Sequence, residues 1–145
     1  MDISALASSP LDAYIQFKYP EIKDLLKHFL SLISATLVFS VTFSEKVIDF
    51  HKSATNQKFI VFLAWILFSI ALAACGLGIY LNYLTAEAAI SAKISGDMAD
   101  FLTFERLSYM AQDAAALLYV LGLFVLVSSA IVRVRTKASS TASDA

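Results

Sequence analysis

Apolar and polar positions alternate along this chain in long blocks, with three apolar runs separated by two polar connections. The runs cover residues 25–43, 59–84 and 114–132, and the second and third contain no charged residue over 26 and 19 positions. About 20 apolar residues in a helix cross a hydrocarbon layer of about 30 Å. The pattern therefore predicts three transmembrane helices, of which the first is the shortest, because Lys27 and His28 leave 15 uninterrupted positions.

The longer polar connection has a helical pattern of its own. Residues 85–94 are rich in Ala and Glu, which favours continuation of the second helix. Ser95 and Gly96 then indicate a helix end, and Asp97 is a typical N-cap for the helix that follows. We expect the second and third spans to form a long helical hairpin that projects beyond the membrane, in an all-α integral membrane fold.

The two ends of the chain differ from this central domain, which we place at residues 20–137. Residues 1–19 are expected to be peripheral, with a helix start at Ser9-Pro10. This segment is either an interfacial amphipathic helix or a loosely ordered terminus. A second helix start is expected at Pro20, and the Ser/Thr/Ala-rich tail, residues 138–145, is predicted to be disordered.

Composition supports a membrane protein and excludes several other classes. Apolar residues make up 59 % of the 145 positions and charged residues 16 %, which is too apolar for a soluble domain of this size. The net charge of −1 gives no basic surface for nucleic acid. The single cysteine, Cys75, excludes an intrachain disulfide and a multi-cysteine zinc site.

Cations near the span ends predict the orientation. Three cations follow the third span at once, and Lys52 and Lys58 precede the second. Since positive residues collect on the inner side, we expect the N-terminus outside and the C-terminus inside, most simply in a plasma (inner) membrane.

Small residues on the second span suggest where helices pack. Gly76 and Gly78 resemble the start of a dinucleotide fingerprint, but Leu81 stands where the third glycine belongs. Small residues four apart instead allow close helix approach in membranes. The candidate helix-packing face consists of Ser69, Ala71, Ala73, Ala74, Cys75 and Gly78.

Three further groups of polar residues are candidates for function. A polar stripe on the first span either lines a pore or forms hydrogen bonds between helices; it consists of Thr36, Ser40 and Ser44. An inner charged network is either a gate or docking point for a cytoplasmic partner, or an ordinary solvated helix end; it consists of Glu45, Lys46, Asp49 and Lys52. An outer polar cluster lies where the spans leave the hydrocarbon; it consists of Lys27, His28, Asn82 and Asp113. Within it, Lys27 and Asp113 either form an ion pair or each reach headgroup water separately.

No sequence motif indicates catalysis. The chain has no Gly-x-Ser-x-Gly elbow, Walker A loop or zinc-binding His pattern, so we expect no enzyme activity, cofactor or metal. The first hypothesis for function is a self-associating, pore-type or membrane-perturbing protein. The alternative is an accessory or scaffold subunit of a larger membrane complex, and an enzyme of unfamiliar type carries less weight. The expected partners are the lipid bilayer and either another copy of the chain or another membrane protein.

Overall fold

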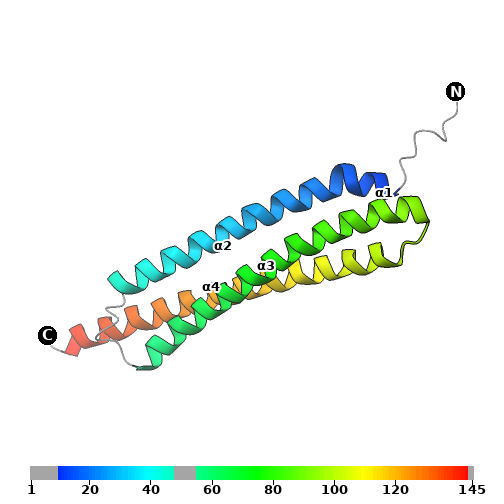
Figure 1. Ribbon diagram of the computed structural model, residues 1–145. Coiled ribbons are helices and arrows are strands. Elements are labelled where there is room, and N and C mark those ends of the chain that lie inside the picture. Colours follow the sequence, from blue (N-terminus) through cyan, green and yellow to red (C-terminus); the bar gives the residue numbers. More distant parts are fainter. Residues whose placement is uncertain (1–9, 48–54, 144–145) are drawn as a thin grey trace. The chain divides into compact units, whose positions relative to one another are not determined.

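The computed structural model describes residues 10–47 and 55–143, with side chains described for 11–44 and 58–132 (Figure 1). In these ranges every regular element is helical, in the order α1 (Pro10–Ala13), a π-helical turn (Tyr14–Lys18), α2 (Tyr19–Val47), α3 (Thr55–Ser95) and α4 (Ala99–Ser143). Three helical stretches are long and apolar enough to cross a membrane: Leu11–Ser44, which begins in α1 and continues through the π-helical turn into α2, Lys58–Ser95 in α3, and Ala99–Val132 in α4. The predicted all-α membrane fold with three spans is confirmed.

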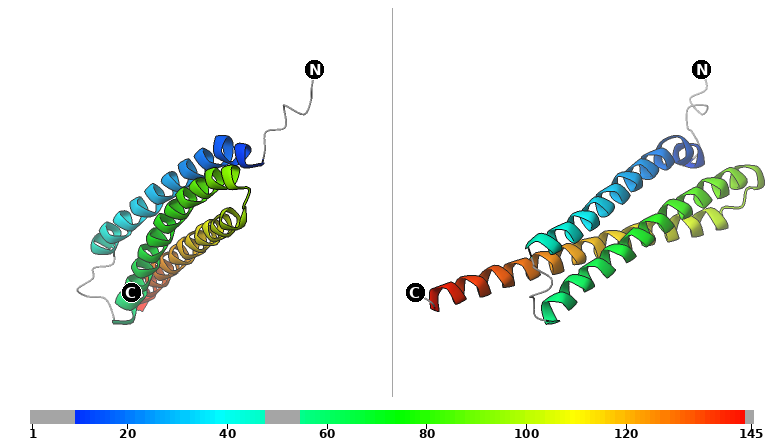
Figure 2. Two further views of the ribbon diagram at one scale, coloured as in Figure 1. Left: turned by 45° about the vertical axis from the view of Figure 1, so that its right-hand side comes forward. Right: turned by 60° about the vertical axis from the view of Figure 1, so that its left-hand side comes forward.

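Helices α3 and α4 form the predicted hairpin, and they run beside each other in all the views of Figures 1 and 2. The backbone turns at Gly96, whose φ of 78° lies in the left-handed region that glycine tolerates best. Its N–H donates to the Ala92 carbonyl at 2.8 Å, which closes the end of α3. The Asp97 carboxylate accepts from the Ala99 N–H at 2.9 Å, so the predicted cap at the start of α4 is also confirmed.

The N-terminal residues continue directly into the first span. A helix begins at Pro10 as predicted, but Pro20 does not interrupt it, because a π-helical turn precedes this proline. Proline cannot donate to the carbonyl four residues earlier, and its ring collides with that carbonyl in a regular α-helix. The Tyr19 N–H bonds to the Tyr14 carbonyl, five residues back, and this wider turn accommodates Pro20.

The buried positions of α3 follow a seven-residue repeat. They alternate in steps of three and four along 32 residues, the spacing of the contact positions in a left-handed coiled coil. The positions are Val61, Ala64, Phe68, Ala71, Cys75, Gly78, Asn82, Thr85, Ala89 and Ala92.

The other two helices show the same repeat. Buried residues of α4 recur every seventh position, and α2 has three in the same rhythm. On α4 they are Phe101, Ser108, Ala115, Gly122 and Ser129, and on α2 they include Leu26, Ile33 and Ser40. This repeat is not evident in the sequence, because most of its members are small or polar and so create no apolar stripe.

The surface has the opposite composition to the interior. Large apolar side chains on all three helices are exposed, among them Phe39, Phe62, Ile70, Leu121 and Phe124. Small residues inside and large apolar residues outside are the arrangement expected where lipid, and not water, surrounds a bundle.

Contacts divide the chain into two compact units, and each long helix contributes a segment to both. Unit 1 contains the described residues of 1–31 and 73–114, and unit 2 those of 32–72 and 115–145. The charged residues with described side chains lie in unit 1, apart from Lys58.

At the C-terminal end, α4 continues through Ser143. The helix therefore extends beyond Ala138, where composition had predicted the start of a disordered tail.

Candidate functional site

Unit 1 has a core that joins the N-terminal turn to the hairpin. Leu11 and Tyr14 are buried against Ala89, Ala92 and Phe101. The rings of Tyr14 and Phe101 meet edge to face, with centroids 5.2 Å apart. Residues 10–18 are thus packed on α3 and α4 and do not form a loosely ordered terminus, because Leu11 and Tyr14 fill the space beside two small alanines. The interfacial position of this segment stays a prediction.

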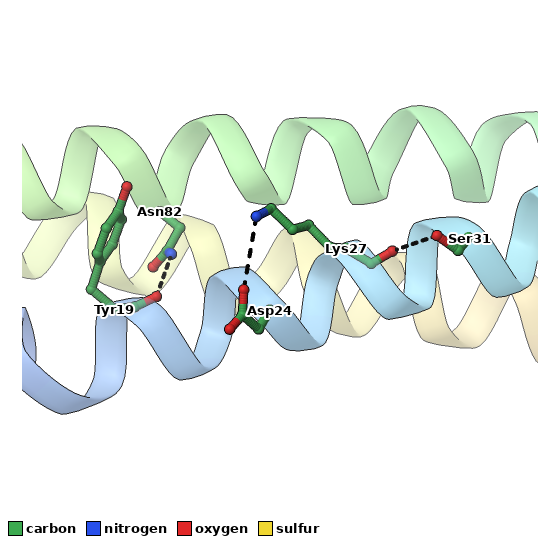
Figure 3. A network of polar contacts seen from close by, with 5 residues as sticks. All are labelled: Tyr19, Asp24, Lys27, Ser31 and Asn82. Carbon is green, nitrogen blue, oxygen red and sulfur yellow. Dashed lines mark hydrogen bonds and ion pairs between the residues drawn. The ribbon is translucent and has the colours of Figure 1, made fainter.

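A buried hydrogen-bond network fixes this packing. The Tyr14 hydroxyl donates to the Asn82 side-chain oxygen at 2.9 Å, and these residues expose 3 % and 1 % of their surface. The Asn82 amide nitrogen donates to the Tyr19 carbonyl at 3.5 Å, as Figure 3 shows. A buried polar residue at a coiled-coil contact position costs stability unless it is paired, and it selects one register. Asn82 therefore sets how the π-helical turn sits on α3.

Two ion pairs join the helices of unit 1 near its surface. The Lys93 ammonium lies 2.6 Å from an Asp12 carboxylate oxygen, and the Lys18 ammonium lies 3.9 Å from Glu105. These pairs are partly exposed, so each contributes about 0–1 kcal/mol to stability. Their positions are more informative than their energy, since they tie residues 12–18 to both arms of the hairpin. Neither pair was expected from sequence.

Among the described residues, no hydrogen bond or ion pair joins two members of the outer polar cluster. Lys27 pairs with Asp24, one helical turn earlier, at 3.8 Å (Figure 3), and no ion pair of the described residues joins it to Asp113. Asp113 and His28 are exposed. Asn82 belongs to the Tyr14 network instead. The alternative in which Lys27 and Asp113 act separately fits these contacts.

Half of the candidate helix-packing face lies in the interior. Ala71, Cys75 and Gly78 are buried, and the Cys75 thiol approaches the Leu26 carbonyl at 3.5 Å. The Ser108 hydroxyl lies 3.4 Å from the Gly78 carbonyl, and Gln112 donates to Ser108 at 3.0 Å. Small residues on α3 therefore let α2 and α4 approach closely.

The other half of that face points outward. Ser69 and Ala73 are exposed, and Ala74 is half-buried. A spacing of four residues does not by itself place a residue on the inner side. Only two positions in each repeat of seven, separated by steps of three and four residues, face the other helices.

The polar stripe points into unit 2. The Thr36 hydroxyl lies 3.1 Å from the Tyr119 hydroxyl across the α2–α4 contact and also bonds to the Leu32 carbonyl. Ser40 and Ser44 are fully buried, and their hydroxyls donate to carbonyls of their own helix at 2.7 and 2.6 Å. Such internal bonding is the arrangement of a packed seam and not that of a hydrated lining.

A close contact of two helices completes unit 2. The Phe68 ring lies over Gly122, where an added Cβ would come within 2.7 Å of a ring carbon. The Tyr119 ring is 5.9 Å from that of Phe68. The importance of Gly122 was also missed in the sequence, although its place in the seven-residue series 101, 108, 115, 122 and 129 is a usable signal.

The inner charged network lies outside the described side chains. Glu45 and Lys46 lie in α2, where only their backbone is described, whereas Asp49 and Lys52 lie outside the described residues. Within the described part of the chain, no group of three or more His, Cys, Asp or Glu residues is placed to hold a metal ion.

The surface of α4 in unit 1 has a shallow, open hollow. It is lined by Leu102, Thr103, Arg106, Leu107 and Met110. Three of these are exposed apolar side chains around one exposed cation. No acidic side chain of the described residues pairs with Arg106.

Comparison with protein-family models, curated proteins and solved structures finds no match to this chain. The assignment of function therefore depends on its own residues.

Proposed function

We propose that this protein is a non-catalytic accessory subunit of a membrane complex, which holds unit 1 at the membrane surface as a binding platform. The observation that carries the proposal is the hollow on α4, an apolar surface around Arg106, which forms no ion pair with another described residue. Exposed apolar patches rimmed by polar residues mark interaction sites in proteins. Arginine and methionine are also enriched at protein interfaces.

The polar groups of unit 1 favour binding over catalysis. Tyr14, Asn82, Asp12 and Lys93 form bonds within the bundle, so they stabilise one arrangement of the helices. A rigid surface loses less entropy when it binds a partner.

The polar groups of the membrane segments favour an accessory subunit over a pore. An oligomeric pore needs polar or suitably hydrated surfaces between its copies. The serines of the polar stripe are buried within the chain, and the outward side chains include Phe39, Phe62 and Phe124. Self-association remains the second hypothesis, because Ser69 and Ala73 leave small residues on the outer side of α3.

The hollow defines the chemistry of the partner. We propose another membrane protein, whose segment beyond the bilayer presents a carboxylate among apolar side chains. The carboxylate pairs with Arg106, and the apolar groups cover Leu102 and Met110. With the orientation proposed from the flanking cations, this contact forms on the outer side of a plasma membrane.

The test is site-specific photocrosslinking in native membranes, with a photoreactive amino acid at Met110. We expect one adduct of discrete mass that contains a second membrane protein, and we expect Arg106→Glu to abolish it. Lys23→Glu is the matched control, because Lys23 is another cation of unit 1 but lies over the Tyr19 ring on α2; the adduct should persist in this variant.

Each other outcome contradicts the proposal. An adduct between two copies of this chain supports the self-association hypothesis instead. Adducts with lipid alone would mean that the hollow faces the bilayer. An adduct that still forms in Arg106→Glu would show that binding does not depend on charge complementarity.

A further inference from the structure

The contacts of Gly78 define one level across the three helices of unit 1. Side-chain atoms of Leu26, Ala111 and Gln112 lie within 4 Å of the Cβ position of Gly78. Residues just beyond this level toward the hairpin turn are therefore those before Leu26 on α2, after Gly78 on α3 and before Ala111 on α4.

Two of these helices carry charges at and beyond that level. On α2, Asp24 and Lys27 flank Leu26 and are exposed, and on α4 the exposed residues Asp113 and Arg106 lie on either side of Gln112 and Ala111. Exposed charges of both signs at one level indicate contact with headgroups and water, because charged groups are costly in hydrocarbon.

Helix α3 differs from its neighbours at this level. From Gly78 to Ala86 it has no charge, and the first charged residue is Glu87. The eight uncharged residues beyond Gly78 extend about 12 Å along a helix. The outward side chains here are large, with Leu77, Tyr80 and Tyr83 exposing 52 %, 58 % and 55 % of their surface.

This outer face continues the lipid-facing side of the same helix. Exposed positions of α3 recur in a seven-residue rhythm, as Phe62, Ile66, Ser69, Ala73, Gly76, Tyr80, Tyr83 and Glu87, and Glu87 is the first charged residue of this series. Tyrosine is enriched where apolar chains meet headgroups, since its ring is apolar and its hydroxyl is polar.

We infer that the bilayer covers unit 1 on one side only. Lipid chains and headgroups contact the outer face of α3 as far as Tyr83, whereas α2 and α4 leave the hydrocarbon about one and a half turns earlier. The bilayer covers this face of α3, and the charged sides of α2 and α4 contact water.

Two tyrosines give a matched test of this inference. Tyr80 follows Gly78 by two residues on α3, and Tyr109 precedes Ala111 by two on α4, so they lie at nearly the same level on different helices. In a Trp65→Phe background, Tyr80→Trp, Tyr83→Trp and Tyr109→Trp each give a protein with one tryptophan, which is then placed in phospholipid nanodiscs. Circular dichroism and a single elution peak identify the variants that fold.

We expect brominated phospholipid to remove most of the fluorescence at positions 80 and 83, and iodide to have little effect there. At position 109 we expect the reverse. Iodide quenching at 80 and 83 as strong as that at 109 would overturn the inference. Equal quenching of all three positions by brominated lipid would also overturn it, because lipid would then surround unit 1 evenly. Protection of positions 80 and 83 from both quenchers would mean that protein covers α3, which is again a contrary result.

Discussion

The glycines of this chain show how strongly single positions differ in the room around them. A Cβ at Gly122 would come within 2.7 and 2.9 Å of the Phe68 ring, and one at Gly78 would lie 3.4 Å from Gln112. At Gly76 nothing lies within 4 Å. Contacts under 3.0 Å force a shift, and an aromatic ring packed between helices has little freedom to make it.

Gly122→Ala should therefore destabilise the protein, by about 1–3 kcal/mol as for other overpacked sites. Gly78→Ala should have a smaller effect, and Gly76→Ala should be neutral or slightly stabilising, since alanine favours a helix. The measurement is the Tm in a mild detergent. Phe68→Leu makes room at the contact, so the double variant Gly122→Ala with Phe68→Leu should lose less than the sum of the two single losses. Equal Tm values for Gly122→Ala and Gly76→Ala would show that Phe68 does not pack on Gly122.

At this scale the sequence could indicate residue types but not pairs. Small residues on the second span suggested close packing, and Ala71, Cys75 and Gly78 do lie in the interior. The bond between Tyr14 and Asn82 joins positions 68 residues apart. No local pattern predicts such a contact, because it depends on how the helices associate.

At the scale of elements, the sequence predicted well those helix boundaries that are set by capping residues. Gly96 and Asp97 end one helix and begin the next because of backbone conformation and hydrogen bonding within four residues. Pro20 was a misleading signal. Its effect on the helix depends on the preceding turn, and the π-helical turn removes the need for a break.

The seven-residue repeat makes a direct prediction for α3. Ala71 is buried and Ala73 is exposed, although both belonged to the same candidate packing face. Ala71→Leu should lower the Tm by inserting bulk between helices, whereas Ala73→Leu should leave it nearly unchanged.

The same pair of variants separates packing within the chain from association between chains. Size-exclusion chromatography in mild detergent should give one elution volume for the wild type and Ala73→Leu. If Ala73→Leu is the more damaging change, the outer side of α3 contacts protein and the assignment of the inner side is mistaken.

At the scale of the whole molecule, composition was sufficient to predict a membrane protein, and the three apolar runs along the chain predicted its three helices. The amount of apolar sequence exceeds what a short soluble chain can bury, and this argument needs no knowledge of contacts. The packing of residues 10–18 on the hairpin was not predictable, because it depends on the space beside Ala89 and Ala92. The hollow around Arg106 was not predictable either, since it depends on which side chains of neighbouring α4 turns are exposed.

Cysteine labelling in intact cells tests the central claim, that the chain crosses the membrane three times and presents unit 1 outside. The variants Asp12→Cys, Ser95→Cys and Ser139→Cys are made in a Cys75→Ala background and treated with an impermeant thiol reagent. Asp12 and Lys93 form an ion pair, so positions 12 and 95 should both react before lysis, and position 139 should react only after it. Reaction of position 139 alone before lysis would contradict the orientation, and equal reaction of positions 95 and 139 would contradict a membrane crossing by α4.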